Sequence, residues 1–186
     1  HGKADLVLGN NVLAHVPAIN DFVKGMRVLL KDDGLLTMEF PHLVELMRNN
    51  QFDTIYHEHF SYLSFTTVEK IFAAHGMRLF DVEKLPTHGG SIRIYGTPIT
   101  HSKYPTSERV TAIKREEDAY GMTTLAAYDR FARQVEATKR DLLDVLIGLK
   151  RQGKKIVGYG APGKGNTLLN YCGIRQDFLD YTVDRN

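Results

Sequence analysis

Four consecutive residues, Tyr56, His57, Glu58 and His59, place a phenol, two imidazoles and a carboxylate on one short stretch of the chain. Histidine has an ordinary pKa of about 6.5, so His57 or His59 can accept a proton near neutral pH. A carboxylate such as Glu58 orients an imidazole, and a phenol such as Tyr56 hydrogen-bonds a developing oxyanion. The four residues therefore favour a general acid–base cluster on an irregular segment, because strand alternation would put Glu58 and His59 on opposite faces.

Two other interpretations of this cluster remain open. His57 and His59 form an H-x-H pair, which is also typical of metal sites. A third ligand would have to come from His15, His42 or His88, none of which has a diagnostic spacing. The H-E-x-x-H motif is absent because position 61 is serine. The plainer alternative is a polar loop that packs on the edge of a sheet.

A glycine-rich stretch, "GYGAPGKGNT", is the second place where residue types suggest chemistry. Gly158, Gly160 and Gly163 match the G-x-G-x-x-G spacing between a predicted strand and a predicted helix, where backbone amides approach a diphosphate. Asp184 follows about 20 residues later, where the dinucleotide fingerprint places its ribose-binding acid. Lys164 can pair with a diphosphate. The stretch predicts a phosphate-bearing ligand.

The same stretch also begins like a P-loop, with Gly158 and Gly163 followed by Lys164. A P-loop then requires a Ser or Thr that binds Mg²⁺, but position 165 is glycine and Thr167 comes two positions late. This disfavours an ATPase or GTPase. A tight turn that binds no ligand remains the plainer alternative.

The elements that position these residues alternate between strand and helix. Residues 4–11 form an apolar run typical of a buried parallel strand. Residues 20–33 have helical spacing, with Asn20 as N-cap and Gly34 just past the end. Residues 35–41 form the next strand. Strand, helix and strand at this spacing predict a parallel βαβ unit.

Further along, a short helix precedes the histidine cluster, and the helical run "TTVEKIFAAHG" follows it. Residues 77–85 and 91–98 are strand-like and separated by "PTHGG", which predicts an antiparallel hairpin. Residues 107–151 have a helical pattern broken near Gly121. A strand, the glycine turn, a helix and another strand follow. The pattern predicts an α/β protein with an antiparallel sheet edge, then a long helix leading into a second α/β region.

The bulk composition narrows the function classes. The chain has 186 residues, with 24 basic and 22 acidic side chains, so it lacks the basic excess typical of nucleic-acid binders. The sequence contains no apolar run long enough to span a membrane. Cys172 is the single cysteine, which fits a reducing cytoplasm. Both ends of the sequence coincide with strands, which favours a fragment of a longer protein. No oligomeric state is predicted.

Five stretches resemble a known family. They are "LGNNVLAHVPAINDFVKG", "GLLTMEFPHL", "NQFDTIYHEHFSYLS", "LPTHGGSIRIY" and "GYGAPGKGNTLLNYCGI…LDYTVDRN". Together they resemble the S-adenosylmethionine-dependent sugar C-methyltransferases, which act at C-3 of dTDP-linked keto-deoxysugars. The resemblance implies that residues 1–104 are the second half of a class I methyltransferase-type sheet. Residues 105–153 would be a connecting helical region, and residues 154–186 the start of a Rossmann-like domain.

The resemblance also implies roles for the cluster. His59 would be the base that removes the C-3 proton, flanked by Tyr56 and Glu58, and His15 would face the same pocket. The enolate beside the C-4 ketone would then attack the methyl carbon of the sulfonium. An acid–base cluster would thus turn a neutral sugar carbon into a nucleophile.

The remaining implied contacts concern the ligands. Asn10 and Asn11 would contact S-adenosylmethionine at the end of the first strand. The turn formed by His88, Gly89 and Gly90 would let backbone approach the sugar. The glycine stretch described above would hold the nucleotide part of the substrate.

The family's glycine-rich cofactor loop and its zinc-binding cysteines do not occur in this sequence. We therefore expect that the chain alone does not methylate. Two alternatives stay open: an NAD-dependent oxidoreductase, and a nucleotide-sugar-binding domain without catalysis.

Overall fold

The computed structural model describes residues 2–185, which form two compact units. The N-terminal unit runs to Asn49, resumes at Glu58 and continues to Ala127. The C-terminal unit takes the intervening residues 50–57 and the chain from Tyr128 onward. The histidine cluster is therefore divided between the units, with the boundary directly before Glu58.

The N-terminal unit contains a four-stranded sheet in the order β1-β2-β4-β3. Its elements are β1 (Ala4–Asn10), η1 (Leu13–His15), α1 (Ile19–Leu29), β2 (Leu30–Pro41), α2 (Leu43–Arg48), α3 (Phe65–Ala74), β3 (Met77–Leu85), η3 (Thr87–Gly89), β4 (Ser91–Pro98) and α4 (Glu108–Tyr120). β1 and β2 pair in parallel, whereas β4 pairs antiparallel with both β2 and β3. The predicted α/β class, the βαβ unit and the antiparallel hairpin are confirmed.

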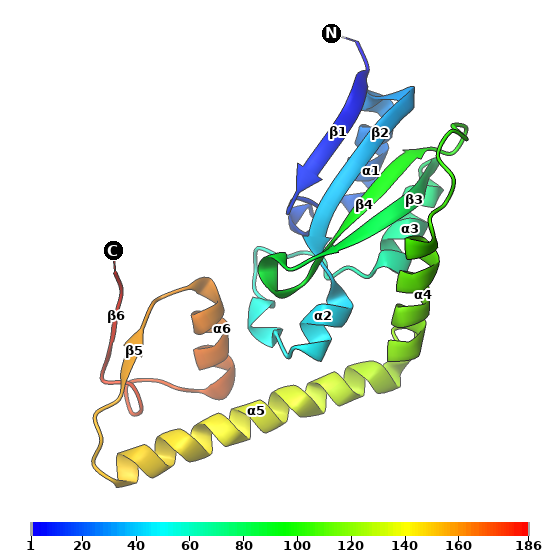
Figure 1. Ribbon diagram of the computed structural model, residues 1–186. Coiled ribbons are helices and arrows are strands. Elements are labelled where there is room, and N and C mark those ends of the chain that lie inside the picture. The colour runs from blue at the N-terminus through cyan, green and yellow to red at the C-terminus, as the bar shows by residue number, and fades with distance from the viewer. Residues whose placement is uncertain (1, 186) are drawn as a thin grey trace. The chain divides into compact units, whose positions relative to one another are not determined.

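One face of this sheet carries the hydrophobic core. Leu36, Met38 and Phe40 alternate along β2, and Ile92 and Ile94 alternate along β4, all of them buried. Period-two alternation places these side chains on one face. The helices α1 and α3 lie behind the sheet in Figure 1 and cover that face.

The opposite face is more polar, and it differs from what the sequence predicts for β1. Glu39 and Arg93 face each other across the β2–β4 ladder. On β1, Leu6 is 50% and Leu8 63% exposed, so the prediction of a buried strand is wrong. The reason is that Leu6 and Leu8 pair with Leu35 and Thr37, on the face of the sheet that α1 and α3 do not cover.

The predicted ends of the first helix are also wrong. The N-cap is Ala18, and Asn20 lies within α1, where its side-chain oxygen is 2.9 Å from Nε2 of His75. The helix ends at Leu29, and Gly34 lies inside β2. Leu30 is fully buried, and a Cβ on Gly34 would approach its side chain to 2.8 Å. Core packing of Leu30 thus starts the strand earlier than the glycine suggests.

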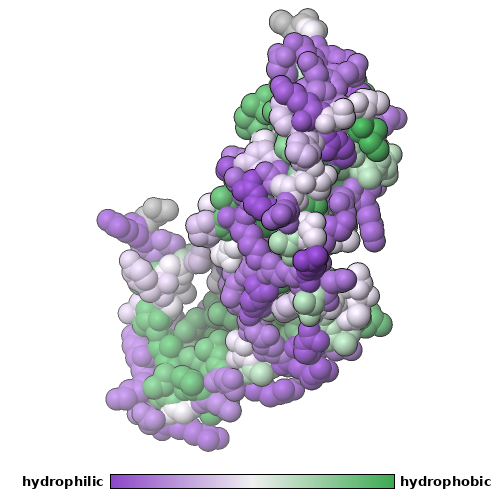
Figure 2. Space-filling view, turned by 45° about the vertical axis from the view of Figure 1, so that its right-hand side comes forward, coloured by the Kyte–Doolittle hydropathy of each residue, from purple (hydrophilic) through white to green (hydrophobic). Residues whose placement is uncertain are grey.

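The C-terminal unit repeats the strand–helix–strand pattern on a smaller scale. Its elements are η2 (Phe52–Thr54), most of α5 (Leu125–Arg151), β5 (Val157–Tyr159), α6 (Gly163–Cys172) and β6 (Tyr181–Val183). β5 and β6 pair in parallel. Leu146, Cys172 and Ile174 form the buried core, and Figure 2 shows hydrophobic residues gathered on this unit.

The break predicted near Gly121 is confirmed, because this glycine closes α4 with a φ of 88°, in the left-handed region. The predicted domain boundaries after residues 104 and 153 stay a prediction. Within residues 2–185, no helix combines the length and apolar character needed to cross a membrane.

Candidate active site

The N-terminal unit brings His15 and His59 together from segments 44 residues apart in sequence, with ring centroids separated by 4.8 Å. His15 ends η1, and His59 lies on the irregular segment that follows the unit boundary. Tyr62 meets the His59 ring edge-on, with centroids 5.9 Å apart. The predicted base therefore lies between a second imidazole and an aromatic ring.

A backbone carbonyl fixes the proton of His15. Nδ1 of His15 lies 2.9 Å from the carbonyl oxygen of Glu58. A carbonyl oxygen only accepts hydrogen bonds, so Nδ1 carries a proton and Nε2 of the neutral ring keeps its lone pair. The sequence suggested that the Glu58 carboxylate orients an imidazole, whereas the structure shows its backbone carbonyl in that role.

The same segment is held to η1 by backbone hydrogen bonds. The amides of Phe60 and Ser61 both donate to the carbonyl of Ala14, at 2.9 and 3.2 Å. These bonds fix the chain on the C-terminal side of His59. The irregular segment that an acid–base cluster requires is therefore present.

Tyr56 and His57 belong to the C-terminal unit, so only their local contacts are described. Tyr56 is half-buried, and its ring meets that of His57 edge-on with centroids 6.3 Å apart. The roles predicted for Tyr56, Glu58, His59 and His15 stay predictions.

A second cluster joins the end of β1 to the turn η3. Asn10 is exposed at the last position of β1, and Asn11 follows in the left-handed region with a φ of 55°. Nδ2 of Asn11 lies 2.8 Å from Nε2 of His88, which also has a left-handed φ of 53°. An amide nitrogen only donates, so Nε2 of His88 accepts this bond. The structure thus joins a predicted cofactor contact to a predicted sugar contact.

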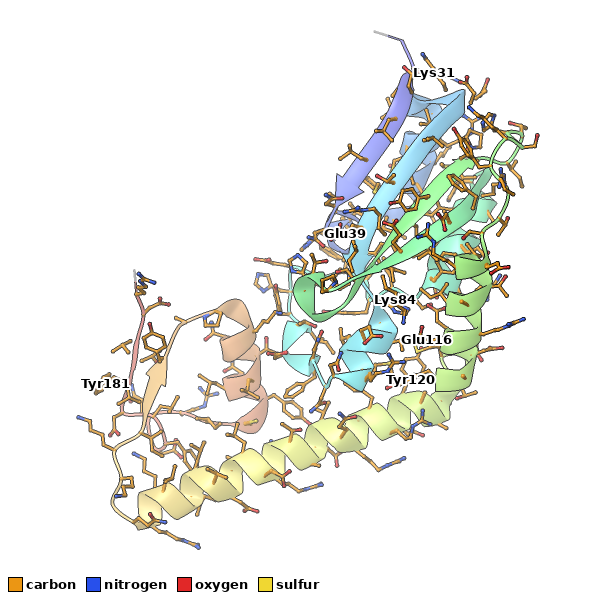
Figure 3. All side chains as sticks on the ribbon, in the orientation of Figure 1. Lys31, Glu39, Lys84, Glu116, Tyr120 and Tyr181 are labelled. Carbon is orange, nitrogen blue, oxygen red and sulfur yellow. The ribbon has the colours of Figure 1, made fainter. Side chains whose placement is uncertain are left out.

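Glu39, at the end of β2 and labelled in Figure 3, organises this cluster. The residue is 5% exposed, and its carboxylate accepts hydrogen bonds from Thr87 Oγ1 at 2.9 Å and Arg93 Nη2 at 2.7 Å. Burial alone would raise the pKa of the Glu39 carboxyl, but the bonds from Arg93 and Thr87 outweigh it and lower the pKa. The carbonyl of Glu39 also accepts the amide of Asn11 at 2.8 Å.

Sequence reasoning missed Glu39, Thr87 and Arg93. An acid inside an otherwise apolar strand, "LLTMEFP", was the one available signal, because a buried carboxylate needs partners. The partners themselves follow from the antiparallel register, which no local pattern reveals.

Gly89 and Gly90 complete the turn, with φ values of 80° and 123°. At Gly90 an added Cβ would lie 2.6 Å from the Cβ of Glu45 on α2. The fold itself therefore requires glycine at this position, independently of any sugar. The role of the turn in sugar binding stays a prediction.

The glycine stretch has the predicted local structure. β5 ends at Tyr159, Gly160 has a φ of 89°, and α6 begins at Gly163. A Cβ on Gly158 would meet Thr182 Oγ1 at 3.0 Å, so that glycine serves strand packing. Gly163 has open space where a Cβ would be.

Asp184 directly follows β6 and turns toward the glycine stretch. Its Oδ2 accepts the amide of Ala161 at 2.8 Å, and its Oδ1 accepts the amide of Arg185 at 2.6 Å. The acid predicted to bind a ribose is therefore bonded to the turn itself. Lys164 is exposed at the start of α6. Nucleotide contacts by these residues stay predictions.

Two further observations bear on the alternatives. Within residues 2–185, no group of three or more His, Cys, Asp or Glu side chains is placed to hold a metal ion, which gives the metal interpretation no support. The C-terminal unit has an open apolar groove of about 390 Å³ lined by residues such as Phe131 and Tyr171. Its lining includes none of the predicted site residues.

Comparisons with known proteins agree with the motifs. A family model for the C-methyltransferase C-terminal domain matches residues 86–186, and one for a methyltransferase domain matches residues 1–82. The C-methyltransferase NovU of Streptomyces niveus is 39% identical over 184 residues, which are 99% of this chain and 44% of that protein. The chain thus spans less than half the length of this curated relative.

Solved structures resemble the chain less closely. The magnesium protoporphyrin IX methyltransferase of Synechocystis PCC 6803 with bound SAH is 16% identical, with a TM-score of 0.42 over 53% of this chain and 46% of that one. The 1,6-didemethyltoxoflavin-N1-methyltransferase of Burkholderia thailandensis gives 16% and 0.40 over the same shares. Both TM-scores are below 0.5.

The family follows from the sequence match itself. The C-methyltransferase model covers residues 86–186, which is more than half of the chain, and the second model covers most of the remainder. The chain belongs to the S-adenosylmethionine-dependent C-methyltransferases, as its motifs predict.

Proposed function

We propose that the whole protein containing these residues transfers a methyl group from S-adenosylmethionine to C-3 of a dTDP-linked keto-deoxysugar. The observation that carries this proposal is the adjacent pair of imidazoles, His15 and His59, one of which has its proton fixed by a backbone carbonyl. We also propose that it acts in the cytoplasm, which fits the single cysteine of these 186 residues, since Cys172 can form no disulfide within them.

The chemistry explains why such a base is needed. A saturated sugar carbon is not a nucleophile, but a neighbouring ketone makes its proton acidic. Removal of that proton by an imidazole leaves an enolate, and the proton stays on the imidazole until it passes to solvent. When bound, S-adenosylmethionine would supply the electrophilic methyl carbon that the enolate attacks, with the sulfur–methyl bond breaking and the sulfur leaving as a neutral thioether.

His15 suits the role of a proton acceptor as well as His59 does. Its Nδ1 proton is held by the carbonyl of Glu58, so Nε2 is the nitrogen with an available lone pair. His59, the base that the resemblance implies, lies beside it. Either imidazole can take the proton at C-3, and variants of both are needed to separate their roles.

The residues at the end of β1 fit a cofactor that donates hydrogen bonds. Oδ1 of Asn11 is buried and has no hydrogen-bond partner among residues 2–185. An unpaired buried acceptor is unfavourable unless a ligand satisfies it. S-adenosylmethionine offers amino-group donors of the required kind, and Asn10 is exposed at the same edge.

The position of methylation can be tested directly. A C-4 ketone acidifies the protons at both C-3 and C-5, so the chemistry alone allows either carbon, while the motif resemblance points to C-3. The reaction product formed by the full-length protein that contains these 186 residues should be analysed by NMR. A methyl group on C-3 supports the proposal, and one on C-5 would overturn the finer assignment.

Substitution of the two imidazoles tests the base. His59→Asn should lower kcat by about 10²–10⁴-fold, the usual contribution of general base catalysis. His15→Asn should also lower it. His75→Asn is the control, since His75 directly follows α3 and contacts Asn20. Unchanged turnover in both His59→Asn and His15→Asn would overturn the proposed mechanism.

Binding by the glycine stretch separates the remaining alternatives. The 186-residue chain should be titrated calorimetrically with dTDP and, separately, with NADH. Saturable binding of dTDP with weak binding of NADH supports a nucleotide-sugar site. Tight binding of NADH would favour the oxidoreductase instead.

A further inference from the structure

A buried pair, His42 and Glu117, lies where the segment that carries His59 leads into α3. His42 follows β2 and is 0% exposed, while Glu117 projects from α4 and is 2% exposed. Nε2 of His42 is 2.8 Å from Oε1 of Glu117. Burying two such groups is unfavourable unless they bond one another or other groups, so their bonding partners show what the pair organises. Nδ1 of His42 has no hydrogen-bond partner among residues 2–185, so Nε2 makes the one bond of this ring.

Glu117 caps helix α3 from a distant part of the chain. Its Oε1 accepts the amide of Phe65 at 2.5 Å and its Oε2 accepts the amide of Thr66 at 2.9 Å. These are the first amides of α3, where a negative charge is favourable. Burial opposes ionisation, but the bonds from His42 and Thr66 prevail and lower the pKa of Glu117.

The backbone amides of His42 and Leu43 form hydrogen bonds with two further segments. The amide of His42 donates to the carbonyl of Gly90 in the turn after η3, at 3.0 Å. The amide of Leu43 donates to the carbonyl of Leu63, also at 3.0 Å. The pair therefore fixes the chain directly before α3, a few residues after His59.

The chain around His59 is thus held on both sides within the N-terminal unit. Before His59, the carbonyl of Glu58 bonds Nδ1 of His15. After it, Ala14 accepts the amides of Phe60 and Ser61, and Leu43 and Glu117 hold residues 63–66 further along. The chain between Asn49 and Glu58 belongs to the other unit, so His59 depends on these anchors.

We propose that Glu117, acting through His42 and the N-terminus of α3, is a positioning residue that holds the His59 imidazole against His15. The importance of this arrangement for catalysis rests on the proposed function. The contact between the two imidazoles does not depend on that function, and it can be measured without substrate.

The test compares Glu117→Gln with a matched control in the 186-residue chain. Thr97→Val removes another fully buried hydrogen bond, from Oγ1 to the carbonyl of Gly34, at the other end of the sheet. We expect Glu117→Gln to abolish the NMR cross-peaks between the His15 and His59 rings. It should also speed hydrogen exchange of the Phe60 and Ser61 amides at least tenfold relative to Thr97→Val.

A second pair of variants keeps the test decisive if Glu117→Gln does not fold. His42→Gln restores a donor close to the position of Nε2 and should keep the ring cross-peaks, whereas His42→Phe should lose them. Intact cross-peaks in Glu117→Gln, or in His42→Phe, would overturn the inference. Loss of the cross-peaks in Thr97→Val as well would also overturn it, because the effect would then reflect general destabilisation.

Turnover separates this inference from the proposed function. In the longest natural chain that contains these residues, Glu117→Gln should lower kcat by about 10²-fold with little change in KM, as expected for a misplaced catalytic group. If the unaltered protein transfers no methyl group but the cross-peaks change as expected, the proposed function fails and the positioning role stands.

Discussion

The two turns that carry predicted ligand contacts are built in different ways. The turn after β3 is held by side chains from other elements: Thr87 binds Glu39 and His88 binds Asn11. The glycine turn after β5 is exposed, and its contacts come from β6 and from Asp184 just beyond it. The first turn is therefore preorganised by long-range contacts, while the second is a short local structure.

This difference predicts how substitutions in each turn affect folding and ligand binding. Preorganised groups bind a ligand without first losing conformational freedom, whereas an exposed turn is ordered more fully by the ligand itself. We expect substitutions in the first turn to affect folding strongly, and substitutions in the second to affect nucleotide binding more than folding. Four predictions test this comparison.

Gly90→Ala should have the largest effect on stability. Its φ of 123° is unfavourable for any side chain, and the new Cβ would lie 2.6 Å from that of Glu45. We expect a loss of about 3 kcal/mol or more in the free energy of unfolding, from backbone strain and overpacking together. Urea denaturation measures it. A loss below about 1 kcal/mol would show that this turn is no more rigid than the glycine turn.

Glu39→Gln should destabilise the protein in a pH-dependent way. The folded pKa of Glu39 is lowered from its ordinary value of 4.5, so its ionised form stabilises the fold above that pH. This contribution disappears as the pH falls through the lowered folded value. The difference in unfolding free energy between Glu39→Gln and the unaltered chain should therefore be largest near neutrality and shrink below about pH 4.5. A difference that is constant with pH would contradict this.

Asn11→Ala should cost about 1–2 kcal/mol, because it removes the bond to His88 and leaves a left-handed φ of 55° without a residue that tolerates it. Asn11→Gly is the matched variant, since glycine adopts this φ freely and loses only the hydrogen bond. Thermal unfolding should rank Asn11→Gly above Asn11→Ala. The reverse order would indicate that the backbone conformation contributes little.

Gly163→Ala should have the smallest effect on folding. Its φ is not positive, a Cβ there has open space, and the residue is the first of α6. We expect a change within about 0.5 kcal/mol in either direction. Calorimetry with dTDP should nevertheless show weaker binding, since a methyl group would hinder phosphate approach. Unchanged affinity would argue against a phosphate at this turn.

Local sequence patterns predict much of this fold, and their failures have a physical cause. The βαβ unit, the hairpin and the break at Gly121 follow from periodicity and turn residues, and the structure confirms them. The predicted ends of the first helix are wrong for two reasons. The side chain of Asn20 bonds His75 and does not cap the helix, and burial of Leu30 outweighs the stop signal at Gly34. β1 was predicted to be buried from its apolar composition, although burial depends on what covers the strand.

For the candidate site too, local patterns predict some features and not others. Residue types and short spacings alone identify the chemical groups available, two imidazoles near a phenol and a carboxylate, and a glycine turn that opens a helix. They also identify the family, through motifs along nearly the whole chain. These are properties of residue types and short spacings, which a local pattern carries.

Which of these groups meet depends on the packing of distant segments. Asn11 binds His88 across 77 residues, and His42 binds Glu117 across 75. The pairing of β1, β2 and β4 and the packing of α4 bring them together. Sheet register and helix packing minimise the exposed apolar surface of the whole unit, so these contacts depend on residues far from either partner and are not encoded in any short segment.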